Sequence, residues 1–332
     1  MKTKAFHIIL ILLPFVFLAS FIVEKHDPAF FEGINADDLK ICVISDLNSS
    51  YGSTTYSDDV KAVITRLALI KPDIILCAGD MVAGQKASLT GQHIRDMWAG
   101  FKNTVLNPIH KLKIPFSFTV GNHDASPSFA IDRTISAQFW KENAKATGLT
   151  FVDSTHYPFY YSYTRKNAFF ISWDAAGAEI QPQVFDWVQT QLSSKGAKKA
   201  GLRILIGHLP LYAIVDSKNK PGEVNSDPEA ALALFKRYGV DLYISGHQHA
   251  YYPAEMEGIR FLNMGCIGDG PRKLIGDTAA AIKSYTIIDV PVRNAKKFTY
   301  RTYTTSDNEL IEMKNLPDSV VGFNGISRKD RH

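Results

Sequence analysis

The sequence predicts a sheet-centred α/β fold with one polar site where its strands end. From residue 36 onward, short apolar runs alternate with segments of helical spacing, and the chain becomes rich in strands toward its end. This alternation is typical of folds in which helices cover a sheet. Because ligands bind at the carboxyl ends of such strands, the polar residues that follow the apolar runs indicate one shared site. Five apolar runs lead through small residues to Asp, Asn or His, at 41–46, 74–80, 116–124, 204–208 and 242–249.

The first half of the chain is expected to alternate strands with helices. Ser57 suits the N-cap of a helix in which Val60, Ile64 and Leu67 recur at helical spacing. Pro72 marks the end of that helix, because the residue before a proline avoids helical geometry. The expected strands are 40–45, 74–78 and 115–120, and the further helices are 91–106 and 134–146.

The second half is expected to be richer in strands. Pro182 suits the first turn of a helix at 182–192, and a second helix is expected at 230–238. Together these segments predict one domain over residues 37–305, followed by an irregular polar tail at 306–332. The expected strands are 160–163, 168–172, 203–206, 242–245, 259–264, 284–290 and 298–304.

Composition is that of a globular protein with a large core. The chain has 332 residues, of which 45% are hydrophobic. Its net charge of +4 comes from 37 basic and 33 acidic residues, which are spread along the chain, so we expect no dedicated nucleic-acid surface. The 3 cysteines show no CxxC spacing, which argues against a disulfide framework.

The N-terminus has the pattern of a targeting or membrane segment. Lys2 and Lys4 precede an almost wholly apolar run at residues 5–23, which approaches the ~20 residues needed to cross a bilayer. Residues 17–20 lack the small-x-small pattern of a good cleavage site. We therefore expect residues 1–25 to be an uncleaved anchor, with the domain exported to the outer side of the cytoplasmic membrane. If the segment is instead a cleaved signal, the protein is periplasmic or extracellular.

Polar side chains of metal-binding type follow the expected strands. Oxygen and imidazole donors without thiolate suit divalent ions such as Mn, Fe, Zn or Co, and argue against a cysteine-type zinc site. The set exceeds what one ion takes, whereas two ions about 3.5–4 Å apart, bridged by a carboxylate and a hydroxide, would clamp the oxygens of a phosphoryl displacement. We expect Asp80 to be the bridge. The donors are Asp46, Asn48, Asp80, Asn122, His208, His247 and His249.

The order and spacing of five motifs resemble the signatures of the calcineurin-like metallophosphoesterase superfamily, which includes purple acid phosphatases and cyclic-nucleotide phosphodiesterases. The likeness covers residues 40–264, and five motifs in order are far more specific than any one of them. The resemblance implies a four-layer αββα double β-sandwich with helices on both outer faces. The motifs are Asp46-Leu47-Asn48, Gly79-Asp80, Gly121-Asn122-His123-Asp124, Gly207-His208 and Gly246-His247-Gln248-His249.

The same resemblance implies a metal-dependent hydrolase acting on ester bonds, either a phosphatase or a phosphodiesterase. Two divalent ions, Mn, Fe or Zn, would serve as cofactors, and a hydroxide bridging them would attack phosphorus. His123 would donate a proton to the leaving oxygen or stabilise the transition-state charge. Carried over by position, the first ion would be bound by Asp46, Asp80 and His249, and the second by Asp80, Asn122, His208 and His247.

The first motif departs from the common pattern. Many members have His where this chain has Asn48, and the purple phosphatases supply a Tyr where it has Ala83. Asn48 could coordinate only through a neutral carbonyl oxygen, so we expect weaker binding of the first ion and no tyrosinate-to-iron colour. Candidate substrate contacts lie in loops beside the ligand-bearing segments, with ordinary loop packing as the alternative for each. These candidates are Tyr51, Tyr251 and Arg272.

The predicted function is hydrolysis of a phosphomonoester or phosphodiester, with a phosphate ester as substrate and the membrane as a further partner. Two alternatives stay open. One is a membrane-attached, catalytically weakened binding module of the same fold, against which the retained His123 speaks. The other is a hydrolase that acts on non-phosphate bonds at the same centre.

Overall fold

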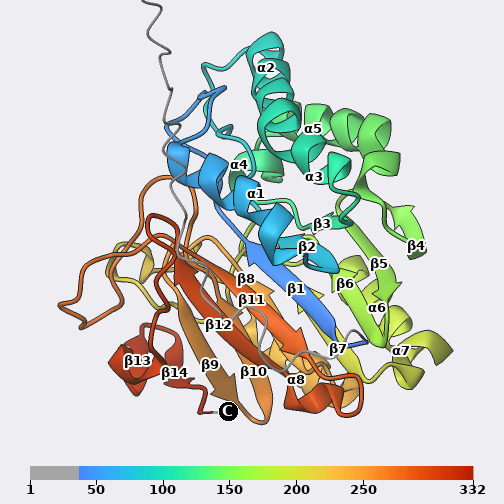
Figure 1. Ribbon diagram of the computed structural model, residues 1–332, viewed down its shortest axis with the longest axis vertical. Coiled ribbons are helices and arrows are strands. Elements are labelled where there is room, and N and C mark those ends of the chain that lie inside the picture. The colour runs from blue at the N-terminus through green and yellow to red at the C-terminus, as the bar shows by residue number, and fades with distance from the viewer. Residues whose placement is uncertain (1–36, 332) are drawn as a thin grey trace, which may run out of the picture. The chain divides into compact units, whose positions relative to one another are not determined.

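Two mixed β-sheets, each covered by helices on its outer face, make up the protein in this computed structural model, which describes residues 37–331 (Figure 1). The layers follow the order helix, sheet, sheet, helix, which confirms the predicted α/β class and αββα sandwich. The predicted anchor at residues 1–25 lies outside the described residues. Among residues 37–331, no helix is both long and apolar enough to cross a membrane.

The smaller sheet has five strands in the order β12-β11-β1-β2-β3. β1, β2 and β3 run parallel, whereas β11 is antiparallel to both β1 and β12. β2 and β3 are buried at every position, as expected of parallel strands covered on both faces. The strands are β1 (Leu39–Ile44), β2 (Ile74–Cys77), β3 (Phe116–Phe118), β11 (Ser284–Val290) and β12 (Thr299–Thr304).

The larger sheet has nine strands in the order β13-β14-β9-β10-β8-β7-β6-β5-β4. The central strands β10, β8, β7 and β6 run parallel to one another, and all the other neighbouring pairs are antiparallel. The strands are β4 (Phe151–His156), β5 (Tyr160–Arg165), β6 (Ala168–Ser172), β7 (Leu202–Ile206), β8 (Leu242–Ser245), β9 (Tyr252–Met256), β10 (Ile259–Asn263), β13 (Ser319–Gly322) and β14 (Gly325–Lys329).

The C-terminal stretch corrects one prediction. Residues 306–332 are expected from sequence to be irregular, but β13 and β14 form a hairpin, and β14 pairs with β9 at the edge of the larger sheet. Only one face of the hairpin is buried, through Val320 and Ser327, whereas Val321 and Ile326 are exposed. The apolar signal is therefore short and divided between the two faces, which hides the hairpin in the sequence.

The helices mostly match their predicted positions. The side chain of Ser57 accepts from the Val60 amide, which confirms the predicted N-cap. The helix expected at 91–106 instead continues through a π-helical turn at Lys102–Leu106 into a short helix that contains Pro108. The helices are α1 (Asp58–Ile70), α2 (Gly91–Phe101), α3 (Asn107–Lys111), α4 (Asn122–Ala125), α5 (Ala130–Asn143), α6 (Pro182–Ser193), α7 (Lys195–Lys199) and α8 (Pro228–Tyr238).

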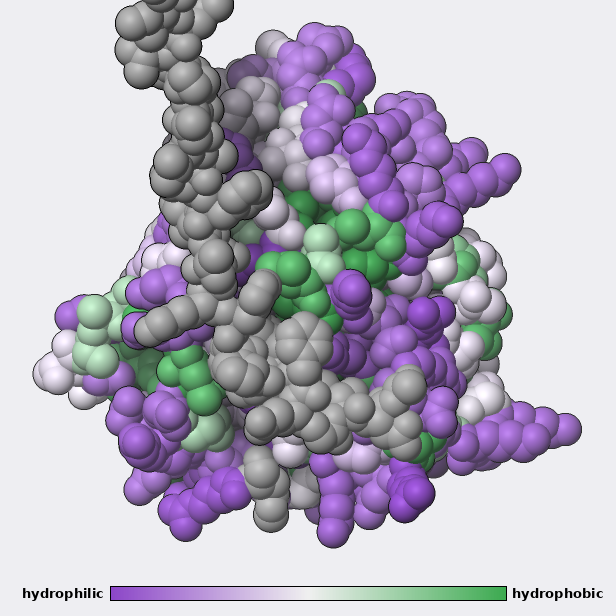
Figure 2. Space-filling view, in the orientation of Figure 1, coloured by the Kyte–Doolittle hydropathy of each residue, from purple (hydrophilic) through white to green (hydrophobic). Residues whose placement is uncertain are grey.

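Apolar faces of the helices pack on the sheets. Trp98 and Phe101 of α2 and Trp140 of α5 form an aromatic cluster with Phe116 and Phe118 of β3, in which the Trp140 and Phe118 rings stack 3.7 Å apart. The outer surfaces of α2 and α5 are hydrophilic (Figure 2). On the larger sheet, α6 and α8 contribute to the core together with β6, β7 and β8. One buried and one solvated face per helix is what a covering layer requires.

The two sheets meet next to the ends of their parallel strands. The Ser172 hydroxyl at the end of β6 donates to the Phe118 carbonyl at 2.9 Å, and the Thr119 hydroxyl donates to the Trp173 carbonyl at 3.0 Å. These bonds bring the carboxyl ends of β1, β2 and β3 to those of β7 and β8. The fold thus places all five predicted motifs at one edge of the sandwich.

Candidate metal centre

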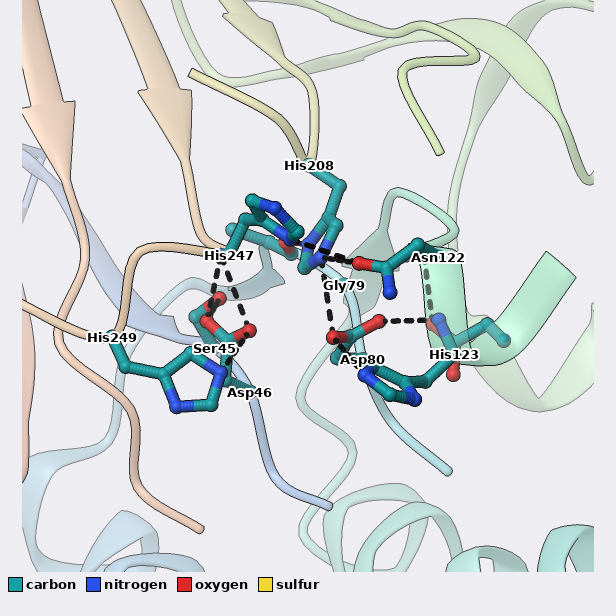
Figure 3. Close-up of polar contacts among 12 residues, drawn as sticks. Ser45, Asp46, Gly79, Asp80, Asn122, His123, His208, His247 and His249 are labelled. Carbon is teal, nitrogen blue, oxygen red and sulfur yellow. Dashed lines mark hydrogen bonds and ion pairs between the residues drawn. The ribbon is translucent and has the colours of Figure 1, made fainter. Parts of the chain in front are cut away.

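The predicted donors follow the ends of β1, β2, β3, β7 and β8, and all lie in short loops except Asn122, which is the first residue of α4 (Figure 3). Backbone hydrogen bonds tie these loops together: the Asp46 amide donates to the Gly79 carbonyl at 3.0 Å, and the Gly246 amide to the His208 carbonyl at 2.9 Å. These bonds join neighbouring loops within each sheet, and the His247 amide, which donates to both carboxylate oxygens of Asp46 at 3.1 Å, joins the loops of the two sheets.

Four of the predicted donors have a left-handed backbone. Their φ angles are 50° for Asp46, 54° for Asp80, 67° for His247 and 53° for His249. For residues with a Cβ atom this conformation costs of order 1–2 kcal/mol each. Strain that is kept at four positions of one site indicates a functional constraint on where these side chains point.

Glycines beside the donors leave room for them. A Cβ atom on Gly121 would collide with the Asp80 carboxylate, and one on Gly246 would lie 2.8 Å from Asp46 Oδ2. Neither glycine has a positive φ angle, so the need is for space and not for backbone freedom. In these two motifs the glycine is explained by the close approach of neighbouring side chains, among them a donor carboxylate.

One group of donors gathers around Asp80 and Asn122. Asp80 Oδ2 lies 3.2 Å from His208 Nε2. Asn122 Oδ1 lies 3.0 Å from the same His208 nitrogen and 2.9 Å from His247 Nδ1. These four atoms, from two strands of each sheet, face one another in the buried centre (Figure 3).

A second group gathers around Asp46. Asp46 Oδ1 lies 3.1 Å from His249 Nε2, and Asp46 Oδ2 accepts from the Ser45 hydroxyl at 2.6 Å. Asp80 belongs to both groups: one comprises Asp80, His208 and His247, the other Asp46, Asp80 and His249, and within each the donor atoms lie within 4.8 Å of one another. The shared carboxylate is the one expected to form a bridge.

The charges of the site fit divalent cations. Burial raises the pKa of Asp80, but the neighbouring His208 and His123 more than offset this and hold the pKa well below its usual range. Burial lowers the pKa of His208, yet the charge of Asp80 outweighs it and raises the pKa to about 9. Without a cation, a proton on His208 thus neutralises Asp80. A metal ion that binds these oxygen and nitrogen donors replaces that proton.

His123 lies beside the donors without joining either group. Its backbone amide donates to Asp80 Oδ1 at 2.9 Å, and its Nε2 atom lies 3.9 Å from Asp80 Oδ2. The exposed Tyr51 ring packs against it at a centroid distance of 5.1 Å. The structure therefore brings Tyr51 to the site and leaves the His123 side chain 19% exposed to solvent.

Asp124 has a structural role. It is fully buried, and its carboxylate accepts from the amides of Met81, Val82 and Gly121 at 2.8 to 2.9 Å. Burial, together with the charge of Asp80, raises its pKa to about 7. These bonds fasten the turn that carries Asn122 and His123 to the loop after β2.

The remaining predicted residues lie outside both groups. The Asn48 side chain is buried, and its backbone amide donates to the Asp80 carbonyl at 3.2 Å; its coordination stays a prediction. A guanidinium nitrogen of Arg272 donates to the His247 carbonyl at 3.4 Å. Tyr251 is buried, and its hydroxyl contacts Met313 Sδ at 3.4 Å, which is a packing contact.

Two residues that the sequence did not single out also reach the site. Glu223 Oε2 lies 2.7 Å from His247 Nε2, and Lys218 Nζ lies 3.0 Å from the same nitrogen. Both come from the later part of the loop between β7 and α8, which carries no recognisable motif beyond Gly207-His208 at its start. Only the three-dimensional contact with His247 identifies them.

Comparison with known proteins identifies the family of the chain. The sequence profile of the calcineurin-like phosphoesterases matches residues 39–251, well over half of the chain. The chain belongs to the calcineurin-like phosphoesterase family. Membership confirms the predicted family resemblance, and it implies divalent metal ions, for which the two donor groups are candidates.

Relatives of this calcineurin-like phosphoesterase include several phosphatases. A phosphoenolpyruvate phosphatase from Allium cepa is 25% identical over 212 residues, which are 63% of this chain and 40% of that protein. A purple acid phosphatase from yellow lupin (Lupinus luteus) seeds has a TM-score of 0.61 at 14% identity, covering 83% of this chain and 53% of the lupin chain. The chain thus spans about half the length, or less, of these two relatives.

Two further structures share the fold over most of their own length. A dimetal phosphatase from Danio rerio has a TM-score of 0.53 at 13% identity, covering 82% of this chain and 98% of that one. GAP50, described as the anchor in the inner membrane complex of Plasmodium, has a TM-score of 0.53 at 17% identity, covering 83% and 87%. At these identities the likeness establishes the fold.

Proposed function

We propose that the protein is a metal-dependent phosphoesterase that hydrolyses a phosphomonoester or phosphodiester at a centre of two divalent ions. The observation that carries this proposal is that Asp80 belongs to both donor groups. A buried carboxylate shared by two sets of histidine and carboxylate donors is the arrangement that a dinuclear site requires. The names of the onion and lupin relatives point to the same class of substrate.

Each part of the centre has a task in this reaction. When bound, the two ions supply positive charge to the phosphoryl oxygens and lower the pKa of water, so that hydroxide is available near neutral pH. Asp46 and His249 hold one position, His208, His247 and Asn122 hold the other, and Asp80 serves both. His123 donates a proton from its ring to the leaving oxygen, for which its open side is suited.

The proposal is tested by hydrolysis assays on the full chain. The metal-free protein is loaded with Mn²⁺, Fe²⁺ or Zn²⁺ and offered p-nitrophenyl phosphate and bis-p-nitrophenyl phosphate. Turnover should require metal, stop on chelation and return when metal is restored. A protein that binds metal tightly and hydrolyses neither ester with any of the three ions would contradict the proposal.

One observation favours a second candidate, a membrane-attached and catalytically weakened binding module. Asn48 stands where the resemblance to the family implies a histidine, and an amide there would weaken the donor set at Asp46. The retained His123 and its contacts with Asp80 favour catalysis. The same assays separate the two functions, since the binding module predicts metal binding without turnover.

A further inference from the structure

Each donor histidine uses one ring nitrogen inside the centre and offers the other to an outer partner. His208 Nδ1 lies 2.7 Å from the Ala78 carbonyl, and His249 Nδ1 lies 2.9 Å from the Gly270 carbonyl. His247 is oriented the other way, with Nδ1 inward and Nε2 outward. Its outer partner is a charged side chain from another loop, whereas the other two are neutral carbonyls of the backbone.

We infer that Glu223 is a positioning residue of the metal centre, which orients His247 and selects the tautomer that binds metal. Its carboxylate lies 2.7 Å from His247 Nε2 and is placed to accept a hydrogen bond from the N–H of that nitrogen. With the proton on Nε2, the lone pair of Nδ1 points to Asn122 and His208, where a cation is expected. A carboxylate behind a ligand histidine fixes the ring and makes it a stronger donor. This inference rests on the proposed function, because it takes His247 to be a ligand.

Lys218 offers His247 the opposite arrangement. Its ammonium lies 3.0 Å from His247 Nε2 and 2.8 Å from Glu223 Oε2. A neutral imidazole either donates from Nε2 to Glu223 or accepts at Nε2 from Lys218, but not both. If it accepts, its proton is on Nδ1 and points to Asn122 Oδ1, so the ring cannot bind metal. Glu223 and Lys218 therefore act on metal binding with opposite signs.

The loop that carries Glu223 is fixed by the ligand motif itself. Gln248, between His247 and His249, is fully buried. Its amide nitrogen donates to the Glu223 carbonyl at 3.2 Å, and its oxygen accepts from the amides of Ile214 and Val215 at 3.1 Å. The backbone of Glu223 is thus held by the same loop whose histidine it orients, which is the preorganisation that a positioning residue needs.

Isothermal titration calorimetry, in which Mn²⁺ is added to the metal-free full chain, tests the inference in four variants. E223A should weaken one binding step by about 10- to 100-fold. E223Q should recover most of this loss, because its amide oxygen still accepts from Nε2. K218M should bind as tightly as the wild type or more tightly. E257Q is the matched control: Glu257 also pairs with a lysine at 2.8 Å, at the turn between β9 and β10, and its loss should change nothing.

A second readout is the ¹⁵N NMR spectrum of the His247 ring in the Zn²⁺-loaded protein. The inference predicts a protonated Nε2 and a metal-bound Nδ1. Wild-type affinity in E223A overturns it, and so does equal weakening in E223Q and E223A, which would be a plain charge effect. If the wild type itself binds no divalent ion, the proposed function falls as well, so the two failures are distinguishable.

Discussion

Asp80 Oδ2 and His208 Nε2 lie 3.2 Å apart, with side chains 1% and 0% exposed. Removing one partner of such a buried pair leaves the other without compensation, which is strongly destabilising in proteins. Asp80 is also the one residue common to both donor groups. In the proposed centre, binding of each ion and charge balance at the base of the site would therefore depend on the same carboxylate.

Replacing Asp80 with Asn should abolish metal-dependent turnover. The amide keeps the volume of the side chain but supplies no negative charge to either ion, so metal content should fall together with hydrolysis of bis-p-nitrophenyl phosphate. Metal analysis and the hydrolysis assay on the same sample measure both effects. D96N, on the exposed face of α2, is the control. Normal turnover in D80N would refute the assignment of the centre.

The metal-free protein should lose stability as the pH rises. The pKa of His208 is raised in the folded protein from its ordinary 6.5 to about 9, because Asp80 outweighs the effect of burial. A raised pKa means that the stabilisation is complete below pH 6.5 and is lost as the pH passes 9. Its size is on the order of 3 kcal/mol. The temperature at the midpoint of thermal unfolding should therefore decrease as the pH is raised from 6.5 to 9.5.

The metal-loaded protein provides the contrast for this experiment. A bound ion keeps His208 unprotonated across the same range, so this contribution to the pH dependence should disappear on loading. Equal slopes of stability against pH with and without metal would show that His208 does not hold the proton.

Replacing His123 with Gln should separate catalysis from metal binding. The contact of His123 with Asp80 Oδ1 is made by the backbone amide and survives the substitution. Metal content should stay at the wild-type level, while loss of the proton donor lowers kcat by roughly 10²- to 10⁴-fold. A parallel loss of metal would instead make His123 part of the metal-binding set.

Replacing Asn48 with His should strengthen the donor set at Asp46. Asn48 is buried next to Asp80, to whose carbonyl its amide donates at 3.2 Å. An imidazole is a better donor than a neutral amide oxygen, so the weaker of two metal-binding steps should tighten by about tenfold or more. N48A tells whether the amide coordinates at all, since it should then weaken that step. Two equally tight steps in the wild type, unchanged in N48H, would contradict the prediction.

The ends of the strands could be predicted from sequence because each combines two local signals, a continuous apolar run and the ligand-type residues that follow it. The apolar runs that end at Asp46, Asp80 and His208 are buried parallel strands, and such strands read as continuous apolar stretches. Ligand-type residues after them then identify the site. Strand β9 was not predicted, because Pro253 argues against an internal strand. The structure accommodates this proline because β14 pairs only with Ala254 and Glu255 of β9.

The contribution of the loop between β7 and α8 could not be predicted in this way. Glu223 and Lys218 reach His247 from a polar stretch with no apolar period and no motif. Their role depends on the path of the loop, and that path is set by hydrogen bonds from Gln248 and from the C-terminal hairpin. Contacts of this kind between distant segments leave no pattern in either segment alone.

The C-terminal hairpin should support the metal centre through this loop. The Asn324 side chain, in the turn between β13 and β14, accepts from the Ala213 amide at 3.1 Å and donates to the Leu211 carbonyl at 2.8 Å. The Phe323 amide donates to Asn219 Oδ1 at 2.7 Å, one residue from Lys218. Replacing Asn324 with Ala removes two of these bonds, which should lower the free energy of unfolding by about 1–3 kcal/mol.

The same substitution should also weaken metal binding, because the loop that positions Glu223 is no longer fastened. Phe323→Ala is the matched control: the Phe323 ring is 47% exposed, and its bond to Asn219 comes from the backbone, so both stability and affinity should stay close to the wild type. Thermal unfolding of the metal-free chain and Mn²⁺ titration measure the two effects separately. If N324A lowers stability while metal affinity is unchanged, the hairpin stabilises the sheet edge alone and does not act on the centre.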